Sequence, residues 1–412
     1  MKCKCIFLLF FNSLLFFNDA FGQYLTSSQE VLVKNLTIAG FENLHISVKN
    51  KSTFIFYEDR VYRFEINGLR KILDEASRSL DDSTNLYIIP LMRGIPVFVF
   101  TTQINHSKNY RSSDYDRLVA NHIIQKSFDI DTVRGYLKRA KIVSKSFGRI
   151  DVIFLPGFKL AFGNFASAFE WEVNMATMIQ TSMWKGMLIS AQVIIPFHSE
   201  LQQDGEKKIR MGNILLDQLF RLPKNVFVNA STGIYTYANP ITNSIVSQRY
   251  GVHTDLKKYF MNSKVCFGGY AGLTGQIRFN NGVLEYGPLD KVTAAVYALS
   301  YISKYNLTTG ITAGKYLFDD FAVRLNVSRS FGELNIGLFA VKSSFGTNGG
   351  INFIIPVSAG KHSRPAAVRF LLANDIKYEY TYRTIHRDAD MYDTNTDLTD
   401  KIRDFNYVRE LK

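Results

Sequence analysis

A long run of alternating apolar and polar residues, which begins at Ile150, constrains the fold more than any other feature of the chain. Segments of roughly 10 to 14 residues place apolar side chains on one face and polar or small ones on the other. In residues 321–328, for example, Phe, Val, Leu and Val alternate with Ala, Arg, Asn and Ser. Because successive strand residues point to opposite faces, this pattern predicts β-strands with one apolar face.

A water-soluble β-sandwich also alternates, so other features must separate it from a membrane barrel. The predicted strands exceed the roughly five or six residues usual in soluble proteins. Their polar face carries full charges, which a wet lumen accepts and a sandwich core does not. We therefore predict an antiparallel transmembrane β-barrel over residues 146–384. Aromatic residues expected in its two interfacial girdles are Phe162, Phe165, Trp184, Phe197, Tyr237, Tyr259, Tyr316 and Phe345.

We count thirteen strands between residues 150 and 384. Single-chain bacterial barrels have an even number of strands, because both ends return to the same side of the membrane, so we prefer twelve strands over fourteen. On this count the polar stretches 198–208 and 280–290 lie on the outer side. The tight turns near Pro223, Ser263 and Gly332 lie on the opposite, periplasmic side.

The polar faces of these strands supply the candidate functional residues, which would line the lumen. None of them forms a catalytic or metal-binding pattern, and we expect neither an enzyme nor a cofactor. The candidate lumen-lining residues are Glu170, Glu172, His253, Asp255, Lys257, Arg324, Asn326, Lys377, Glu379 and Arg383.

The first 22 residues have the form of a secretory signal peptide. Lys2 and Lys4 precede the apolar stretch Ile6–Phe17, and Ala20-Phe21-Gly22 supplies the small residues of a cleavage site before Gln23. The apolar stretch is too short to cross a hydrocarbon layer of roughly 30 Å as a helix. No later apolar run approaches the roughly 18 residues of a membrane helix, so an exported chain of this kind would span a membrane only as a barrel.

The exported part carries 47 basic and 35 acidic residues, a net charge of +12. This balance predicts acidic partners such as lipid phosphates or anionic glycans, and no nucleic-acid motif accompanies it. Cys266 is the one cysteine left after the leader, so neither an internal disulfide nor a zinc cluster is expected.

The sequence of residues 23–145 predicts a separate periplasmic α/β domain with the order ββαββ. Leu44–Val48 and Thr53–Tyr57 form the first strand pair, and Phe64–Leu80 has apolar residues at helical spacing. Leu86–Met92 and Ile95–Thr101 form a second hairpin around Arg93-Gly94. The more polar residues 112–141 are expected to form a helical connector.

The sequence of the tail, residues 385–412, predicts an acidic helix that begins near Thr396. We expect this tail to lie in the periplasm. A calcium-loop reading of Asp393, Asn395, Asp397 and Asp404 is weaker, because Leu398 stands where such a loop needs Gly.

Several segments of the chain resemble, in their order, the YjbH/GfcD family of exopolysaccharide-biosynthesis outer-membrane proteins. In the N-terminal region these are Phe41-Glu42-Asn43-Leu44, Tyr57-Glu58-Asp59-Arg60-Val61-Tyr62-Arg63 and Pro90-Leu91-Met92-Arg93-Gly94-Ile95-Pro96-Val97. In the barrel region they are Arg149-Ile150-Asp151-Val152, Gln248-Arg249-Tyr250-Gly251-Val252, Gly314-Lys315-Tyr316-Leu317, Val327-Ser328-Arg329-Ser330-Phe331, Ile336-Gly337-Leu338-Phe339-Ala340 and Ile354-Ile355-Pro356. The family members are longer and carry a second domain-plus-barrel set, whereas this chain has one.

The resemblance implies a non-enzymatic outer-membrane component for export or assembly of an exopolysaccharide or capsule in a Gram-negative cell. We expect the barrel to serve as membrane pathway or docking platform and the N-terminal domain to contact periplasmic machinery. Its partners would be outer-membrane lipid and lipopolysaccharide, the exopolysaccharide, and periplasmic or outer-membrane export proteins. Two other classes stay open: an outer-membrane hydrolase acting on lipid or glycan, and a structural surface anchor or adhesin platform.

Overall fold

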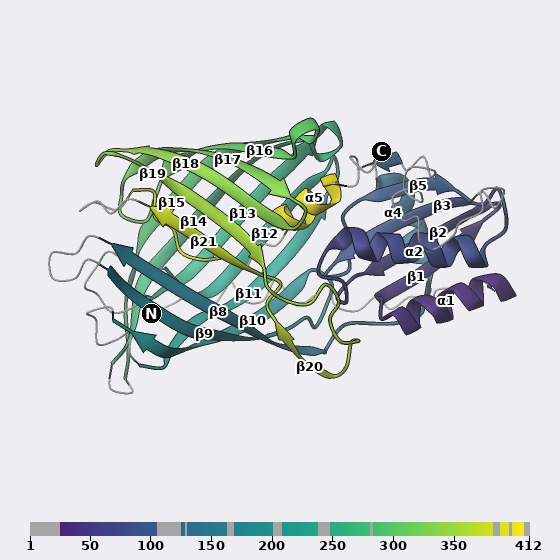
Figure 1. Cartoon of the computed structure of the whole chain (residues 1–412), viewed down its shortest axis with the longest axis horizontal. Coiled ribbons are helices and arrows are strands. Elements are labelled where there is room, and N and C mark those ends of the chain that lie inside the picture. The colour runs from purple at the N-terminus through teal and green to yellow at the C-terminus, as the bar shows by residue number, and fades with distance from the viewer. Residues whose placement is uncertain are drawn as a thin grey trace, which may run out of the picture.

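The computed structural model describes residues 25–104, 125–127, 130–162, 169–200, 208–237, 248–280, 283–381, 388–394 and 398–407. They form a seven-stranded sheet near the N-terminus and a fourteen-stranded sheet after it. Figure 1 shows the two sheets end to end, with the helix α5 (Leu398–Tyr407) where they meet. The predicted leader lies outside the described residues.

The N-terminal sheet is mixed, with the strand order β6-β5-β3-β2-β1-β7 and with β4 paired to β3. Strands β2 and β3 are parallel and joined by α2, whereas β1 and β2 form an antiparallel hairpin. At the β3–β4 turn, Arg93 and Gly94 both have the positive φ of a tight hairpin turn. The elements are α1 (Ser27–Ala39), β1 (Glu42–Lys49), β2 (Ser52–Glu58), α2 (Glu65–Ser79), β3 (Asn85–Met92), β4 (Ile95–Pro96), β5 (Val99–Gln103), β6 (Gln125–Ser127), α4 (Asp131–Arg139) and β7 (Lys141–Ile142).

Helices cover both faces of this sheet. Ile55 of β2 belongs to the buried cluster that contains Leu32 of α1 and Leu69 of α2. Phe54, which points to the opposite face, packs in a second cluster with Val133 of α4. Among the helices that the structure describes, none is long and apolar enough to cross a membrane.

The observed order of elements contains more than the predicted ββαββ pattern. Helix α1 was not predicted, although its start carries a capping box: the Thr26 hydroxyl accepts from the Gln29 amide, and the Gln29 side chain accepts from the Thr26 amide. Within the predicted connector 112–141, the described residues form β6, α4 and the first residue of β7, and residues 112–124 and 128–129 lie outside the described part.

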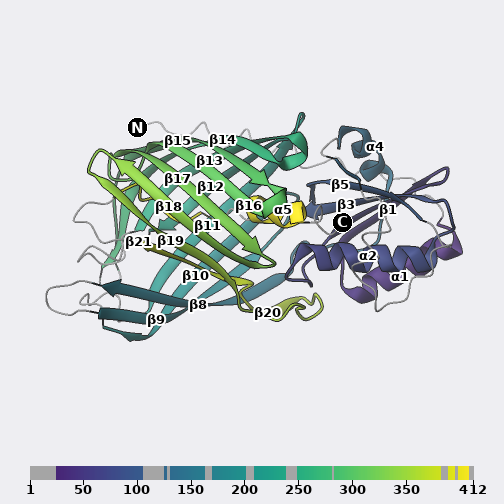
Figure 2. The ribbon, with the colours of Figure 1, turned by 45° about the horizontal axis from the view of Figure 1, so that its top comes forward.

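The large sheet has the order β20-β8-β9-β10-β11-β12-β13-β14-β15-β16-β17-β18-β19-β21. Its neighbours pair antiparallel, except that β20 is parallel to β8. Figure 2 shows the long strands tilted and curling around a common axis. The strands are β8 (Ile150–Phe162), β9 (Phe169–Thr181), β10 (Met187–Ser199), β11 (Arg210–Leu222), β12 (Val226–Thr236), β13 (Gln248–Phe260), β14 (Val265–Asn280), β15 (Val283–Ile302), β16 (Leu307–Lys315), β17 (Phe321–Phe331), β18 (Leu334–Ser343), β19 (Thr347–Pro356), β20 (Val368–Leu372) and β21 (Asp375–Thr381).

The preferred count of twelve strands is wrong, because the structure has fourteen in this sheet. Each of the thirteen predicted segments overlaps a strand, and the last of them, residues 366–384, holds both β20 and β21. Its first half pairs with β8, beginning with Val368 opposite Ile150, and its second half pairs with β19. An even number of strands is required only where all neighbouring strands are antiparallel, and β20 and β8 are parallel.

Most of the polar stretch 280–290, expected to connect two strands on the outer side, belongs to a strand. Strand β14 ends at Asn280, which pairs with Val283 at the start of β15, so the two strands continue through this stretch as a long hairpin. The polar residues of this stretch favour a loop, but their backbone N–H and C=O groups take part in the pairing of β14 with β15. Of the other predicted outer loop, 198–208, residues 201–207 lie outside the described residues.

The two faces of the large sheet differ in character. On β17, Leu325 is 51% exposed whereas Ala322 is 4% exposed, and on β13 the exposed Val252 alternates with the buried His253. We call the buried, polar face the inner face. Three of the predicted girdle residues, Tyr237, Tyr259 and Tyr316, are buried and therefore do not belong to an exposed girdle. Trp184, Phe197 and Phe345 are exposed, and the side chains of Phe162 and Phe165 lie outside the description.

Candidate functional site

The first charged group on the inner face joins β9 and β11. Glu172, which is fully buried, accepts from Arg210 at 2.7 Å and from the Asn174 amide at 2.6 Å. Asn174 lies two residues farther along β9, so alternation in the strand puts both side chains on the same face. The side chain of the neighbouring candidate, Glu170, lies outside the described residues.

The second group lies on β13. Lys257 and Asp255 form an ion pair of 2.8 Å, and the Tyr297 hydroxyl donates to Asp255 at 2.6 Å. His253, one alternation before Asp255, lies with its Nδ1 3.0 Å from the Tyr392 hydroxyl. The structure therefore places these three candidates on one face of β13, where Asp255 pairs with Lys257 and His253 contacts Tyr392 of the C-terminal segment.

The third group connects β17 with β21. Arg324 donates to Glu379 at 3.0 Å through one nitrogen and to the Asn326 side chain at 3.2 Å through another. Lys377, two residues before Glu379 on β21, binds Asp400 of α5 at 2.5 Å. The remaining candidate, Arg383, lies outside the described residues. The predicted residues thus form three separate groups around the inner face and not one centre.

The C-terminal segment lies against the inner face and extends from one end of the large sheet to the other. Asp388 accepts from the hydroxyl of Ser343, at the end of β18 that is far from the N-terminal sheet. Tyr392 then contacts His253 and Thr293 in the interior, at 3.0 and 3.2 Å. Asn406 finally bonds to Ser263, in the turn after β13 on the domain side, at 2.7 Å.

A glycine makes room for this segment. A Cβ atom at Gly272 of β14 would lie 1.9 Å from the Tyr392 hydroxyl, so any larger residue would force Tyr392 to move. No sequence signal singles out Tyr392, because its partners lie about a hundred residues or more away in the chain. Sequence reasoning therefore missed that the interior is occupied.

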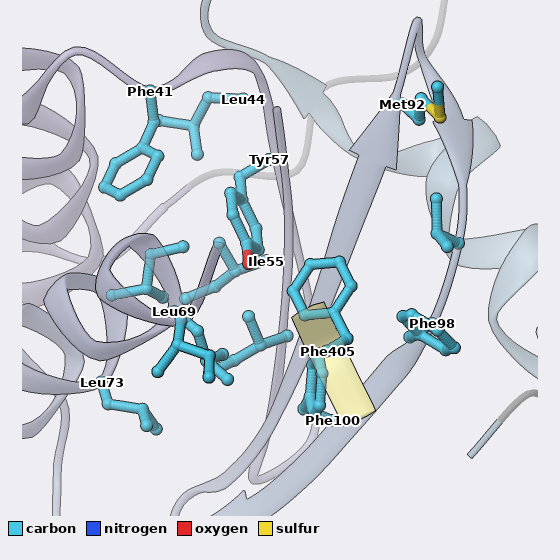
Figure 3. Close-up of a cluster of buried hydrophobic side chains, with 14 of the residues drawn as sticks. Phe41, Leu44, Ile55, Tyr57, Leu69, Leu73, Met92, Phe98, Phe100 and Phe405 are labelled. Atoms are coloured by element: carbon cyan, nitrogen blue, oxygen red, sulfur yellow. The ribbon is translucent and has the colours of Figure 1, made fainter. Parts of the chain in front are cut away.

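Helix α5 lies at the domain-side end of the interior. Leu398, Ile402 and Phe405 are buried in the main cluster of the N-terminal sheet. Phe405 meets Phe98 edge-on, with ring centroids 5.1 Å apart, and Figure 3 shows it standing over Phe100. Lys401 pairs with Glu65 of α2 at 2.5 Å. The same helix thus binds the N-terminal domain through its apolar side and the large sheet through Asp400 and Asn406.

A cluster of buried charges fastens the N-terminal sheet to the edge of the large sheet. Asp151 of β8 binds Arg369 of β20 through two bonds of 3.0 Å and also pairs with Arg60, which follows β2. Glu42 of β1 lies 3.3 Å from Arg60 and pairs with Arg149. Burial raises the pKa of Glu42, and the neighbouring arginines oppose that shift. Three of the segments that carry the family resemblance meet at this cluster.

A cavity of about 780 Å³ lies between the N-terminal domain, the inner face and the C-terminal segment. Its lining mixes cations, acids and amides, among them Arg63, Arg210, Asp393 and Gln192. A volume of this order accommodates a small ligand or a few sugar-sized units. The described residues contain no group of His, Cys, Asp and Glu suited to hold a metal ion. Because its lining carries these charged and amide side chains, the cavity can bind a hydrated ligand that forms hydrogen bonds.

Two acids in the cavity lining, Asp59 and Asp404, have raised pKa values. Burial, with a smaller contribution from Glu65, raises the pKa of Asp59 to about 7. Burial likewise raises the pKa of Asp404 to about 7, against the attraction of Arg403. Both acids lie where α5 meets the N-terminal domain, so the charge of this junction changes near neutral pH.

No protein-family model matches the chain, and no curated protein matches its sequence.

Proposed function

We propose that the large sheet is an outer-membrane β-barrel and that the chain is a non-enzymatic component of exopolysaccharide or capsule export or assembly. The contrast between the two faces of the sheet is the observation that supports a location in the membrane. Exposed Val323, Leu325 and Val327 alternate on β17 with Arg324 and Asn326, as lipid-facing and lumen-facing residues do in barrels.

The segment 368–381 supports closure of the sheet into a barrel. Its first half hydrogen-bonds to β8, at one edge of the sheet, and its second half to β19, at the other. One extended segment thus connects both edges, and a closed sheet has no unpaired edge in the hydrocarbon layer.

The occupied interior favours a docking platform over an open pathway. The C-terminal segment fills part of the proposed lumen, and α5 and the N-terminal domain lie at one of its ends. An anchor without a transport role is the second candidate, because an occupied interior suits it equally. The glycan assignment is supported by the family resemblance, whose segments 41–44, 57–63 and 149–152 meet at the buried charge cluster.

Deletion of the protein from its host tests the function. The proposal expects loss of secreted polysaccharide with surface adhesins intact, and recovery when the wild-type chain is supplied. A chain with Leu325→Arg, which should not assemble, is the control that should fail to restore it. Loss of adhesins with normal polysaccharide would favour the anchor. Hydrolysis of acyl chains or glycan by the purified protein would contradict the non-enzymatic assignment.

A further inference from the structure

The turns at the domain-side end of the large sheet are basic. We call the six connections 182–186, 223–225, 261–264, 303–306, 332–333 and 357–367 the domain-side rim. Their one acid, Glu333, is paired with Arg63. Their basic residues are Lys185, Lys224, Lys264, Lys304, Lys361 and Arg364, of which all but the half-buried Lys264 are exposed.

The connections at the opposite end have the reverse charge. The described residues of these connections, 200, 208–209, 237, 316–320 and 344–346, include three carboxylates and one lysine. The positive charge of the rim therefore does not simply reflect the basic composition of the whole chain. It belongs to one end of the sheet.

Aromatic side chains stand beside the basic ones along the rim. The Lys304 ammonium lies 5.4 Å from the centre of the Tyr305 ring. On β13, next to the rim, the Lys258 ammonium lies 4.9 Å from the centre of the Phe260 ring. Trp184 is 49% exposed next to Lys185. Tyrosine and tryptophan prefer the headgroup level of a bilayer, and lysine extends its ammonium toward the phosphates.

We propose that the domain-side rim binds the headgroups of anionic phospholipids in the membrane leaflet nearest the N-terminal domain. This inference rests on the proposed membrane barrel. Each exposed ammonium can donate to a lipid phosphate, while the aromatic rings lie at the acyl boundary. Anionic lipid would hold the rim at a fixed depth, and with it the domain that Arg60, Asp151 and Glu42 fasten there.

Tryptophan fluorescence gives a direct test, because the chain has two tryptophans. In a Trp171→Phe background, Trp184 reports on the rim alone. The full chain is reconstituted in phosphatidylcholine bilayers with a minor share of brominated phosphatidylglycerol or, in parallel, brominated phosphatidylcholine. Bromine quenches a tryptophan that it approaches, so the ratio of quenching gives the relative affinity of the rim for the two headgroups.

We expect several-fold preference for phosphatidylglycerol, because a basic residue at an anionic surface contributes roughly fivefold in affinity. The variant Lys224→Gln/Lys304→Gln/Arg364→Gln should lower the ratio toward one. The control Lys34→Gln/Lys51→Gln/Lys138→Gln removes the same charge from the domain surface and should leave the ratio unchanged. Equal quenching by both lipids, or an unchanged ratio in the rim variant, would overturn the inference while leaving the barrel intact. Absence of quenching by either lipid would instead reject the membrane barrel itself.

Discussion

At the scale of single residues, Asp59 makes the junction between domain and sheet sensitive to pH. Its pKa of about 7 lies above the ordinary value of 3.8. At a pH between these two pKa values, the folded state therefore keeps a proton that the unfolded chain has released. Stability from this group is consequently highest at acidic pH and falls as the pH rises toward and through 7.

Replacing Asp59 by Asn should weaken that dependence. The variant keeps an oxygen for the backbone amides of Val61 and Tyr62, both at 2.9 Å, and carries no charge to bury. We expect its melting temperature in detergent to exceed that of the wild type at about pH 8, to exceed it by less at about pH 5, and to match it only at a pH below the ordinary pKa of 3.8. Asp404 still titrates, so a smaller slope should persist.

The matched control for this measurement is Asp81→Asn, which removes an exposed carboxylate of the same domain. It should retain the slope of the wild type. A wild-type slope in Asp59→Asn would show that the buried carboxyl does not set the pH response.

At the scale of elements, β17 tests which face meets lipid. Leu325→Arg puts a charge on the exposed apolar face and should cost roughly 2–4 kcal/mol near the bilayer midplane. Arg324→Gln loses the pair with Glu379 on the inner face but stays polar, so it should assemble normally. The heat-modifiable gel shift of folded barrels measures both. Normal assembly of Leu325→Arg together with failure of Arg324→Gln would invert the faces and favour a soluble sandwich.

Helix α5 allows a second test at this scale. Phe405 is fully buried, and Phe405→Ala should weaken docking of the helix by about 3–5 kcal/mol. Amide hydrogen exchange of residues 398–407 should become faster. Phe197→Ala, which truncates a mostly exposed ring at the opposite end of the sheet, is the control and should leave that exchange unchanged. Equal exchange rates in Phe405→Ala and the wild type would show that Phe405 does not hold the helix against the N-terminal domain.

The strands could be predicted from the sequence, and their pairing could not. Local alternation is sufficient to locate β13 and to put His253, Asp255 and Lys257 on one face, because strand geometry repeats every two residues. The change of partner within 368–381 depends on two distant edges meeting. The contact between His253 and Tyr392 spans 139 positions, and a local pattern carries no information about it.

At the scale of the whole molecule, the C-terminal segment occupies the interior of the proposed barrel. The chain ends its last strand at the far end of the sheet and returns along the inner face to the domain side, where α5 joins both parts. Figure 1 shows the helix in that position. The interior would conduct freely only after this segment leaves.

Single-channel conductance in planar bilayers tests this claim most directly. The full chain is compared with a chain that ends after residue 387 and with a control that ends after Tyr407 and keeps α5. The gel shift of each confirms that it is folded. We expect the full chain and the control to insert with low conductance, and the chain ending at residue 387 to form wide, steady pores. A full chain that conducts as widely as the shortened one, or folded chains that never insert, would contradict the account.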